Sequence, residues 1–148
     1  MGLLKPNVNK MEAEKDIEGL VDALGYEKDS LVQLTARIAL KTFGNAAVEP
    51  LIKGLKAKKG DTRLHAAMTL GEFADLRAVE PLIVLLQQDE NEGVRKMAAG
   101  ALAKLGDLRA VKPLENILEN EKPTGKYDLR YEATVALQKL KVASKKTN

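Results

Sequence analysis

The sequence predicts an all-α fold in which pairs of antiparallel helices stack into a solenoid of about four to five repeats. Three observations support this expectation. A nine-residue block recurs along the chain, a second helical block precedes its later copies, and aromatic residues make up only 3% of the composition, so the interior must be aliphatic. A repeat of this size is a supersecondary unit that buries its apolar side only by stacking on its neighbours.

The nine-residue block reads AVEPLIKGL at residues 47–55, AVEPLIVLL at 78–86 and AVKPLENIL at 110–118, with offsets of 31 and 32 residues. Its apolar residues recur at i, i+3 and i+7, as in Val48, Leu51 and Leu55. This spacing predicts a helix with one buried face. Its proline falls in the first helical turn, where the missing N–H is tolerated. Residues 16–24, DIEGLVDAL, are a degenerate earlier copy.

The second block occupies residues 31–44, 61–74, 93–106 and 128–141. Each copy has apolar residues at i, i+4 and i+7, as in Ala36, Leu40 and Phe43, which again predicts a helix. We call this the first helix of a unit, and we call the helix of the nine-residue block the second helix. Turns such as Gly44-Asn45 join the two, because glycine is favoured just past a helix end.

These blocks predict one domain that spans residues 1–148. We expect an N-terminal capping helix within residues 1–15, beginning near Asn7 as the N-cap. The other predicted segments are a degenerate second helix at 16–30, full repeats at 31–60, 61–92 and 93–127, a C-terminal capping helix at 128–141 and a polar tail at 142–148.

The motif D-x-R-A-V-x-P-L, preceded by V-R-x-x-A-A-x-A-L-x-x-L-G, resembles the short HEAT-like repeat of the phycobilisome-lyase type. The fullest match runs from Val94 to Leu114, and the copy before it matches at Asp75, Arg77–Val79, Pro81 and Leu82. The resemblance implies a right-handed, HEAT/armadillo-like superhelix whose second helices line the concave face, the usual binding surface. Such repeats carry many unrelated activities, so the resemblance does not select one.

Composition narrows the function classes. The chain has no cysteine, which excludes disulfides, thiolate catalysis and cysteine-ligated zinc. Its net charge of +3 comes from 24 basic and 21 acidic side chains, a balance that does not indicate a nucleic-acid or membrane partner. No apolar run is long enough for a membrane span or a signal peptide, so the cytoplasm is the default location. A monomer or weak homo-oligomer is expected.

We also expect no cofactor and no catalytic residue. HEAT-like deoxyhypusine hydroxylases, which resemble this chain in fold, bind iron through repeated His-Glu dipeptides. This chain has a single histidine, His65, followed by Ala66. A glycine-rich phosphate-binding motif is also missing. From these residues we expect that the chain is not an enzyme and holds no metal.

The predicted binding surface lies on the second helices, whose outward residues differ between copies. Val84 and Leu85 form an apolar spot where the preceding copy has Lys53 and Gly54. An apolar spot with a polar rim is typical of an interface hot spot, although both side chains could instead pack against an adjacent helix. The predicted partner-binding residues are Lys53, Lys56, Glu80, Val84, Leu85, Gln88, Glu115 and Glu119.

Two further groups of residues stand out. Arginine and aspartate recur at fixed repeat positions, and we expect them to bond between adjacent units; a ladder that binds phosphate or carboxylate is the alternative. The residues of this ladder are Arg63, Arg95, Arg130, Asp75, Arg77, Asp107 and Arg109. An inserted loop before the last predicted helix places Tyr127 near Tyr131. These tyrosines form a contact site or cover the end of the stack.

The function predicted from the sequence is a non-catalytic interaction module that binds another protein or peptide along the concave face. One alternative, which the resemblance suggests, is a bilin lyase-type or chromophore-handling subunit, which requires a deep apolar pocket. A second alternative is nucleic-acid binding, which requires a groove that is basic on one side.

Overall fold

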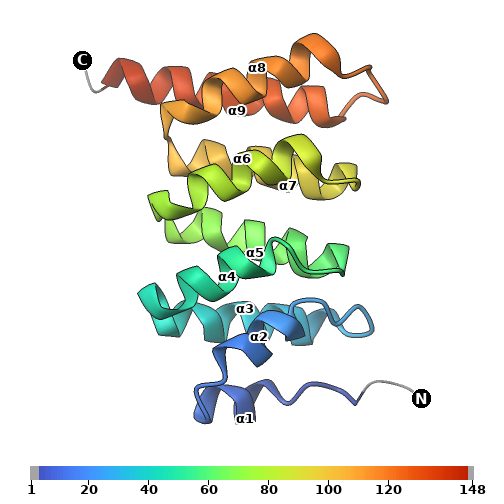
Figure 1. The fold of residues 1–148 in the computed structure, drawn as a ribbon, viewed down its shortest axis with the longest axis vertical. Coiled ribbons are helices and arrows are strands. Elements are labelled where there is room, and N and C mark those ends of the chain that lie inside the picture. Colours follow the sequence, from blue (N-terminus) through green and yellow to red (C-terminus); the bar gives the residue numbers. More distant parts are fainter. Residues whose placement is uncertain (1–3, 147–148) are drawn as a thin grey trace.

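The computed structural model describes residues 4–146, which form helices joined by turns and loops. Figure 1 shows the helices stacked in pairs from the N-terminal to the C-terminal end. The α-helices of the described residues are α1 (Val8–Ala13), α2 (Ile17–Ala23), α3 (Ser30–Phe43), α4 (Val48–Gly54), α5 (Gly60–Phe73), α6 (Val79–Gln88), α7 (Glu92–Leu105), α8 (Val111–Asn120) and α9 (Leu129–Lys146).

The first helices α3, α5, α7 and α9 form one layer of the solenoid, and the second helices α2, α4, α6 and α8 form the other. The core lies between the layers and between successive units. Leu40, Leu70 and Leu102 are fully buried at equivalent positions of three first helices. Leu51 and Leu82 are fully buried on two second helices. The apolar stripes read from the sequence therefore face one continuous core.

The layer of first helices is tightly packed at α5 and α7. A Cβ atom added to Gly71 of α5 would lie 2.9 Å from the Cα atom of Ala101 on α7. A contact this short leaves no room for a side chain, so glycine allows the two backbones to approach.

A short 3-10 helix directly precedes each of three second helices. These are η1 (Gly44–Ala47) before α4, η2 (Leu76–Ala78) before α6 and η3 (Leu108–Ala110) before α8. Gly44 and Gly106 end their helices with positive φ angles of 54° and 70°. Ala74 takes the same place after α5 with a φ angle of 53°. This left-handed conformation is less favourable for alanine than for glycine, because alanine has a Cβ atom. Asp75 and Asp107 then accept bonds from the backbone N–H of Arg77 and Arg109.

The ends of the stack differ from the sequence-based boundaries. Asn7 is the N-cap of α1 and accepts a bond from the Lys10 N–H, but this helix ends at Ala13 and covers little of the predicted 1–15 segment. Helix α9 continues to Lys146, so most of the predicted tail at 142–148 is helical. The segment contains no glycine or proline stop, and lysines in a last turn favour the helix dipole. Residues 1–3 and 147–148 lie outside the described residues.

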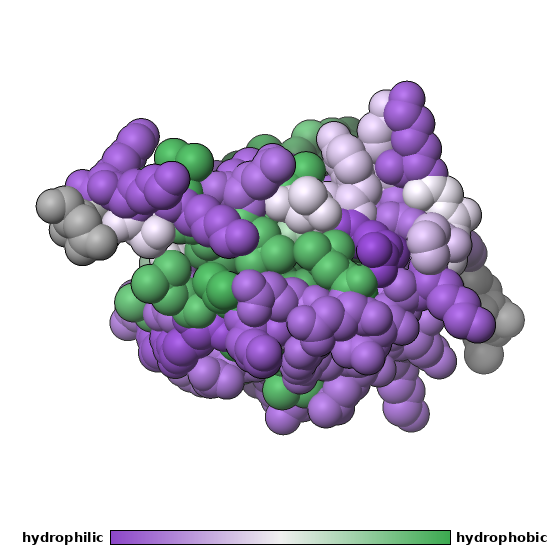
Figure 2. Space-filling view, turned by 90° about the horizontal axis from the view of Figure 1, so that it is seen from above, coloured by the Kyte–Doolittle hydropathy of each residue, from purple (hydrophilic) through white to green (hydrophobic). Residues whose placement is uncertain are grey.

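Figure 2 looks onto the C-terminal end of the stack, where apolar residues form a band across a hydrophilic surface. The outer side of α9 contributes Val135, Val142 and Ala143 to a shallow groove there. First helices inside the stack bury the side that corresponds to this outer side of α9, because the next unit packs against it.

Candidate functional site

Two grooves lie side by side on the layer of second helices. Groove 1, between α2 and α4, has a volume of about 400 Å³, and groove 2, between α4 and α6, has a volume of about 410 Å³. They are related by the repeat, since Pro50 and Lys53 line groove 1 where Pro81 and Val84 line groove 2. Groove 2 is lined by Ile52, Leu55, Lys56, Glu80, Pro81, Val84, Leu85, Gln88 and Asp89.

Groove 2 contains the apolar spot that the sequence indicated, but only one of its two residues is exposed. Val84 has 47% of its surface exposed, whereas Leu85 has 6% and belongs to the core. Leu85 therefore packs in the core, which is the alternative that the sequence left open, and contributes only the floor of the groove. The third copy holds the missed signal: with an offset of 32 residues, Leu85 aligns with Ile117, which is also buried.

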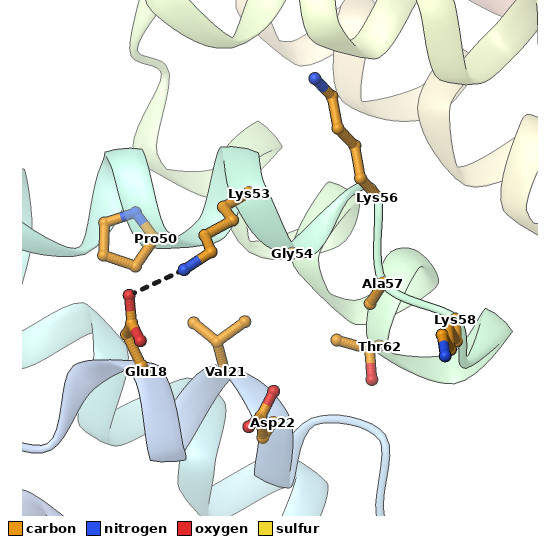
Figure 3. A pocket seen from close by; sticks show the side chains of 10 residues that line it. All are labelled: Glu18, Val21, Asp22, Pro50, Lys53, Gly54, Lys56, Ala57, Lys58 and Thr62. Atoms are coloured by element: carbon orange, nitrogen blue, oxygen red, sulfur yellow. Dashed lines mark hydrogen bonds and ion pairs between the residues drawn. The ribbon is translucent and has the colours of Figure 1, made fainter.

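Groove 1 is occupied by an ion pair at the position equivalent to Val84. The Lys53 ammonium donates to the Glu18 carboxylate at 3.1 Å, as Figure 3 shows. Asp22 and Thr62 lie further along this groove. The two grooves therefore share a backbone arrangement but differ in chemistry, since groove 1 has a charged pair where groove 2 has an exposed valine.

The carboxylates of groove 2 are already paired. Glu80 accepts a bond from Arg109 at 3.4 Å, and Asp89 accepts bonds from Arg63 at 2.6 and 3.0 Å. Lys56 is exposed, and its ammonium group has no hydrogen-bonding or ionic partner among residues 4–146. Figure 3 shows its side chain pointing away from Glu18 and Asp22. The rim of groove 2 therefore presents one uncompensated positive charge.

The two acidic residues predicted on α8 lie outside these grooves. Glu115 is half-buried and Glu119 is exposed, and neither lines groove 1 or groove 2. The structure thus brings together Lys56, Glu80, Val84, Leu85 and Gln88 in groove 2, and places Lys53 in groove 1.

The arginines of the first helices bind the ends of the second helices. Arg63 donates to the carbonyls of Ala57 and Lys58, which follow α4, and to Asp89, which follows α6. One repeat later, Arg95 donates to the Leu86 carbonyl and to Glu121. In the last unit, Arg130 donates to the carbonyls of Leu118 and Glu121. Each guanidinium satisfies carbonyls that a helix C-terminus leaves without partners.

The second set of arginines joins the entrances of successive second helices. Arg77 binds Asp75 in its own turn at 2.8 Å and reaches Glu49 of the preceding unit at 3.3 Å. Arg109 repeats this with Asp107 and Glu80. Hydrogen bonds from these arginines lower the pKa of Asp75 and Asp107 below the ordinary value of 3.8. The guanidinium groups are therefore bonded within the protein.

The inserted loop ends in a pair of exposed tyrosines. The rings of Tyr127 and Tyr131 meet edge to face, with centroids 5.1 Å apart. Asp128 between them is buried and accepts bonds from the N–H groups of Thr124 and Tyr131, which stabilise the charged carboxylate and lower its pKa. The loop is thus tied to the start of α9 while both rings remain accessible.

The single histidine lies half-buried on α5. The Nδ1 atom of His65 is buried and has no hydrogen-bonding partner, and burial lowers its pKa below 6.5. Nowhere in residues 4–146 do three or more His, Asp or Glu side chains cluster as metal ligands would. Within the same residues, no helix is long and apolar enough to cross a membrane.

The two helical layers and their repeated contacts define an α-solenoid protein built from repeats. Residues 48–138 match the family described as HEAT repeats, and the chain belongs to that family. No curated protein matches the sequence significantly.

Two solved structures are similar to this one. Human deoxyhypusine hydroxylase in complex with glycerol superposes with a TM-score of 0.67 at 23% identity, covering 95% of this chain and 45% of the hydroxylase chain. An engineered protein superposes with a TM-score of 0.58 at 25% identity, covering 92% of this chain and 66% of its own. This chain therefore spans less than half of the hydroxylase.

The hydroxylase comparison corrects one expectation. The sequence led us to expect that the chain is not an enzyme, and that exclusion is overturned because an enzyme has the same fold over nearly the whole chain. At 23% identity the likeness shows the fold alone.

Proposed function

We propose that this HEAT-repeat chain is a scaffold that binds a protein or peptide partner along the layer of second helices, with groove 2 as the anchor. The observation that carries the proposal is that Val84, which is 47% exposed, lies in a groove with an apolar floor and a polar rim. An apolar side chain in a cleft with a polar rim is the usual form of an interface hot spot.

The comparison between repeats supports this choice of groove. The residues that align with Val84 are Lys53 and Asn116, both polar. The repeat fold therefore does not require an apolar residue at this place, and its presence in one copy favours a role in binding. The finer resemblance to the phycobilisome-lyase type remains a prediction from the D-x-R-A-V-x-P-L motif.

The proposal is tested by affinity capture from a lysate of the source cells, with the intact chain and the Val84→Asp variant as baits. Ile38→Asp is the matched control, because Ile38 is 55% exposed on α3, away from the second helices. We expect a protein that binds the intact chain and the control but not Val84→Asp, and that binds directly when purified. Capture that is equal for all three baits would contradict groove 2 as the anchor.

A further inference from the structure

We propose that groove 2 recognises an acidic peptide segment, in which an apolar side chain packs on Val84 and a neighbouring carboxylate pairs with Lys56. This inference rests on the proposed function and adds the chemistry of the partner. It follows from the groove floor, from the charges on its rim and from a comparison of the repeats.

The floor of groove 2 accepts an aliphatic side chain. Ile52 and Leu55 of α4 face Pro81, Val84 and Leu85 of α6, and the groove has a volume of about 410 Å³. Contact with these side chains would remove the exposed apolar surface of Val84 from water, which favours binding. No polar side chain interrupts the floor itself, so the anchor of the partner is apolar.

The rim selects the charge next to that anchor. Glu80 and Asp89 are paired with Arg109 and Arg63, so they offer little attraction to an incoming cation. The ammonium group of Lys56 has no partner among the described residues, and Lys56 also borders groove 1. A carboxylate beside the anchor would form an ion pair with Lys56, whereas a lysine there would be repelled.

Lys56 is not a requirement of the repeat. The residues that align with it are Gln87 and Glu119 in the next two copies, which are neutral and acidic. Lys58 follows two positions later and is exposed, and its ammonium group also lacks a partner among the described residues. Two ammonium groups without a partner among the described residues therefore lie where α4 ends, and Lys56 borders the groove that holds the exposed Val84.

A peptide fits these features better than a nucleic acid does. Binding to a phosphate backbone depends on a row of cations. Along this face, however, Glu18 and Asp22 border groove 1, and Glu115 and Glu119 lie on α8. The positive charge is local, which suits one or two carboxylates.

The test is a selection of displayed random peptides, about twelve residues long, against the intact chain, with counter-selection against Val84→Asp. We expect the Val84-dependent binders to share an aliphatic residue flanked by Asp or Glu. The best binder is then titrated against Lys56→Glu and against Lys122→Glu, a control at an exposed lysine in the loop before α9. We expect Lys56→Glu to weaken binding about tenfold and the control to leave it unchanged.

A charge-reversed peptide completes the test. When the acidic residues of the best binder are replaced by lysine, binding to Lys56→Glu should be restored. Val84-dependent binders without excess acidic residues, or binders unaffected by Lys56→Glu, would overturn this inference and leave the proposed function standing. If no peptide depends on Val84, this inference fails, and the proposed function fails with it only if lysate capture is also equal for the three baits. If instead a labelled oligonucleotide binds and Lys56→Glu abolishes this binding, the partner is a nucleic acid.

Discussion

The guanidinium of Arg63 on α5 binds the carboxylate of Asp89, just after α6, with the Nε atom 2.6 Å from Oδ2 and the Nη2 atom 3.0 Å from Oδ1. Both side chains are nearly buried, with 11% and 4% exposed. Burial by itself raises the pKa of Asp89, but the bonds from Arg63 and from the Asn91 N–H outweigh it, so the pKa lies below 3.8. This pair joins a first helix to the end of the second helix that follows.

Removing this arginine should destabilise the fold strongly. Arg63→Ala would leave Asp89 charged, buried and unpaired, and it would also remove the donor to the Ala57 and Lys58 carbonyls. We expect a loss of about 3 kcal/mol in the free energy of unfolding, measured by urea denaturation. Arg77→Ala is the matched comparison, because Arg77 is 42% exposed and its solvent-screened pairs should contribute much less to stability than the Arg63 pair. Equal losses for the two variants would contradict this ranking.

Gly71 should not tolerate alanine, although alanine is the better helix former. The added Cβ atom would lie 2.9 Å from the Ala101 backbone, so α5 and α7 would have to separate. We expect Gly71→Ala to lower the melting temperature and cost about 1–3 kcal/mol. In Gly100→Ala the new Cβ would meet only the tip of the Glu132 side chain, at 3.4 Å. That variant should gain up to about 1 kcal/mol, and a gain at Gly71 as well would show that the helices are not in close contact.

His65 should make the fold less stable at mildly acidic pH. Burial, assisted by Arg37 and opposed by Asp61, lowers the pKa of folded His65 below 6.5. As the pH falls below 6.5, the unfolded chain therefore takes up a proton more readily than the folded chain, and stability decreases. Urea midpoints compared at pH about 7 and about 5.5 should fall for the natural chain. They should change less for His65→Gln, and parallel decreases in both proteins would assign the effect to other groups.

Substitutions at Val84 and Leu85 should differ in their effect on stability, because only Leu85 belongs to the core. Leu85→Ala would leave a cavity in the core, and we expect a loss of about 3 kcal/mol. Val84→Ala should change stability by no more than about 0.5 kcal/mol, because the side chain is 47% exposed. Thermal melts of both variants test this directly. A stability loss at Val84 as large as that at Leu85 would mean that Val84 also serves the core.

Much of the fold could be predicted from the chain because repeats supply their own alignment. Apolar residues that recur at i, i+3 and i+7, such as Val48, Leu51 and Leu55, had to share one buried face of their helix. The recurrence of Arg63 and Arg95 indicated a shared structural environment, but not the helix ends that they bind. Some of these partners are distant in the sequence from the arginines, so the repeat spacing alone could not identify them.

The candidate site was less predictable. Periodicity marks a helix face only to within a neighbouring position, and it could not separate Val84 from Leu85, although Ile117 in the third copy pointed to the difference. It also could not show that Glu115 and Glu119 lie outside both grooves.

The sequence by itself determined the helix pairs, the repeat and the aliphatic core, since these follow from local periodicity and from the need of each unit to stack. Only the tertiary structure decided which charges remain free. Lys53 is paired with Glu18 and Glu80 with Arg109, whereas Lys56 is unpaired among the described residues. Ion pairing depends on distances between side chains of different units, and a one-dimensional pattern does not contain those distances.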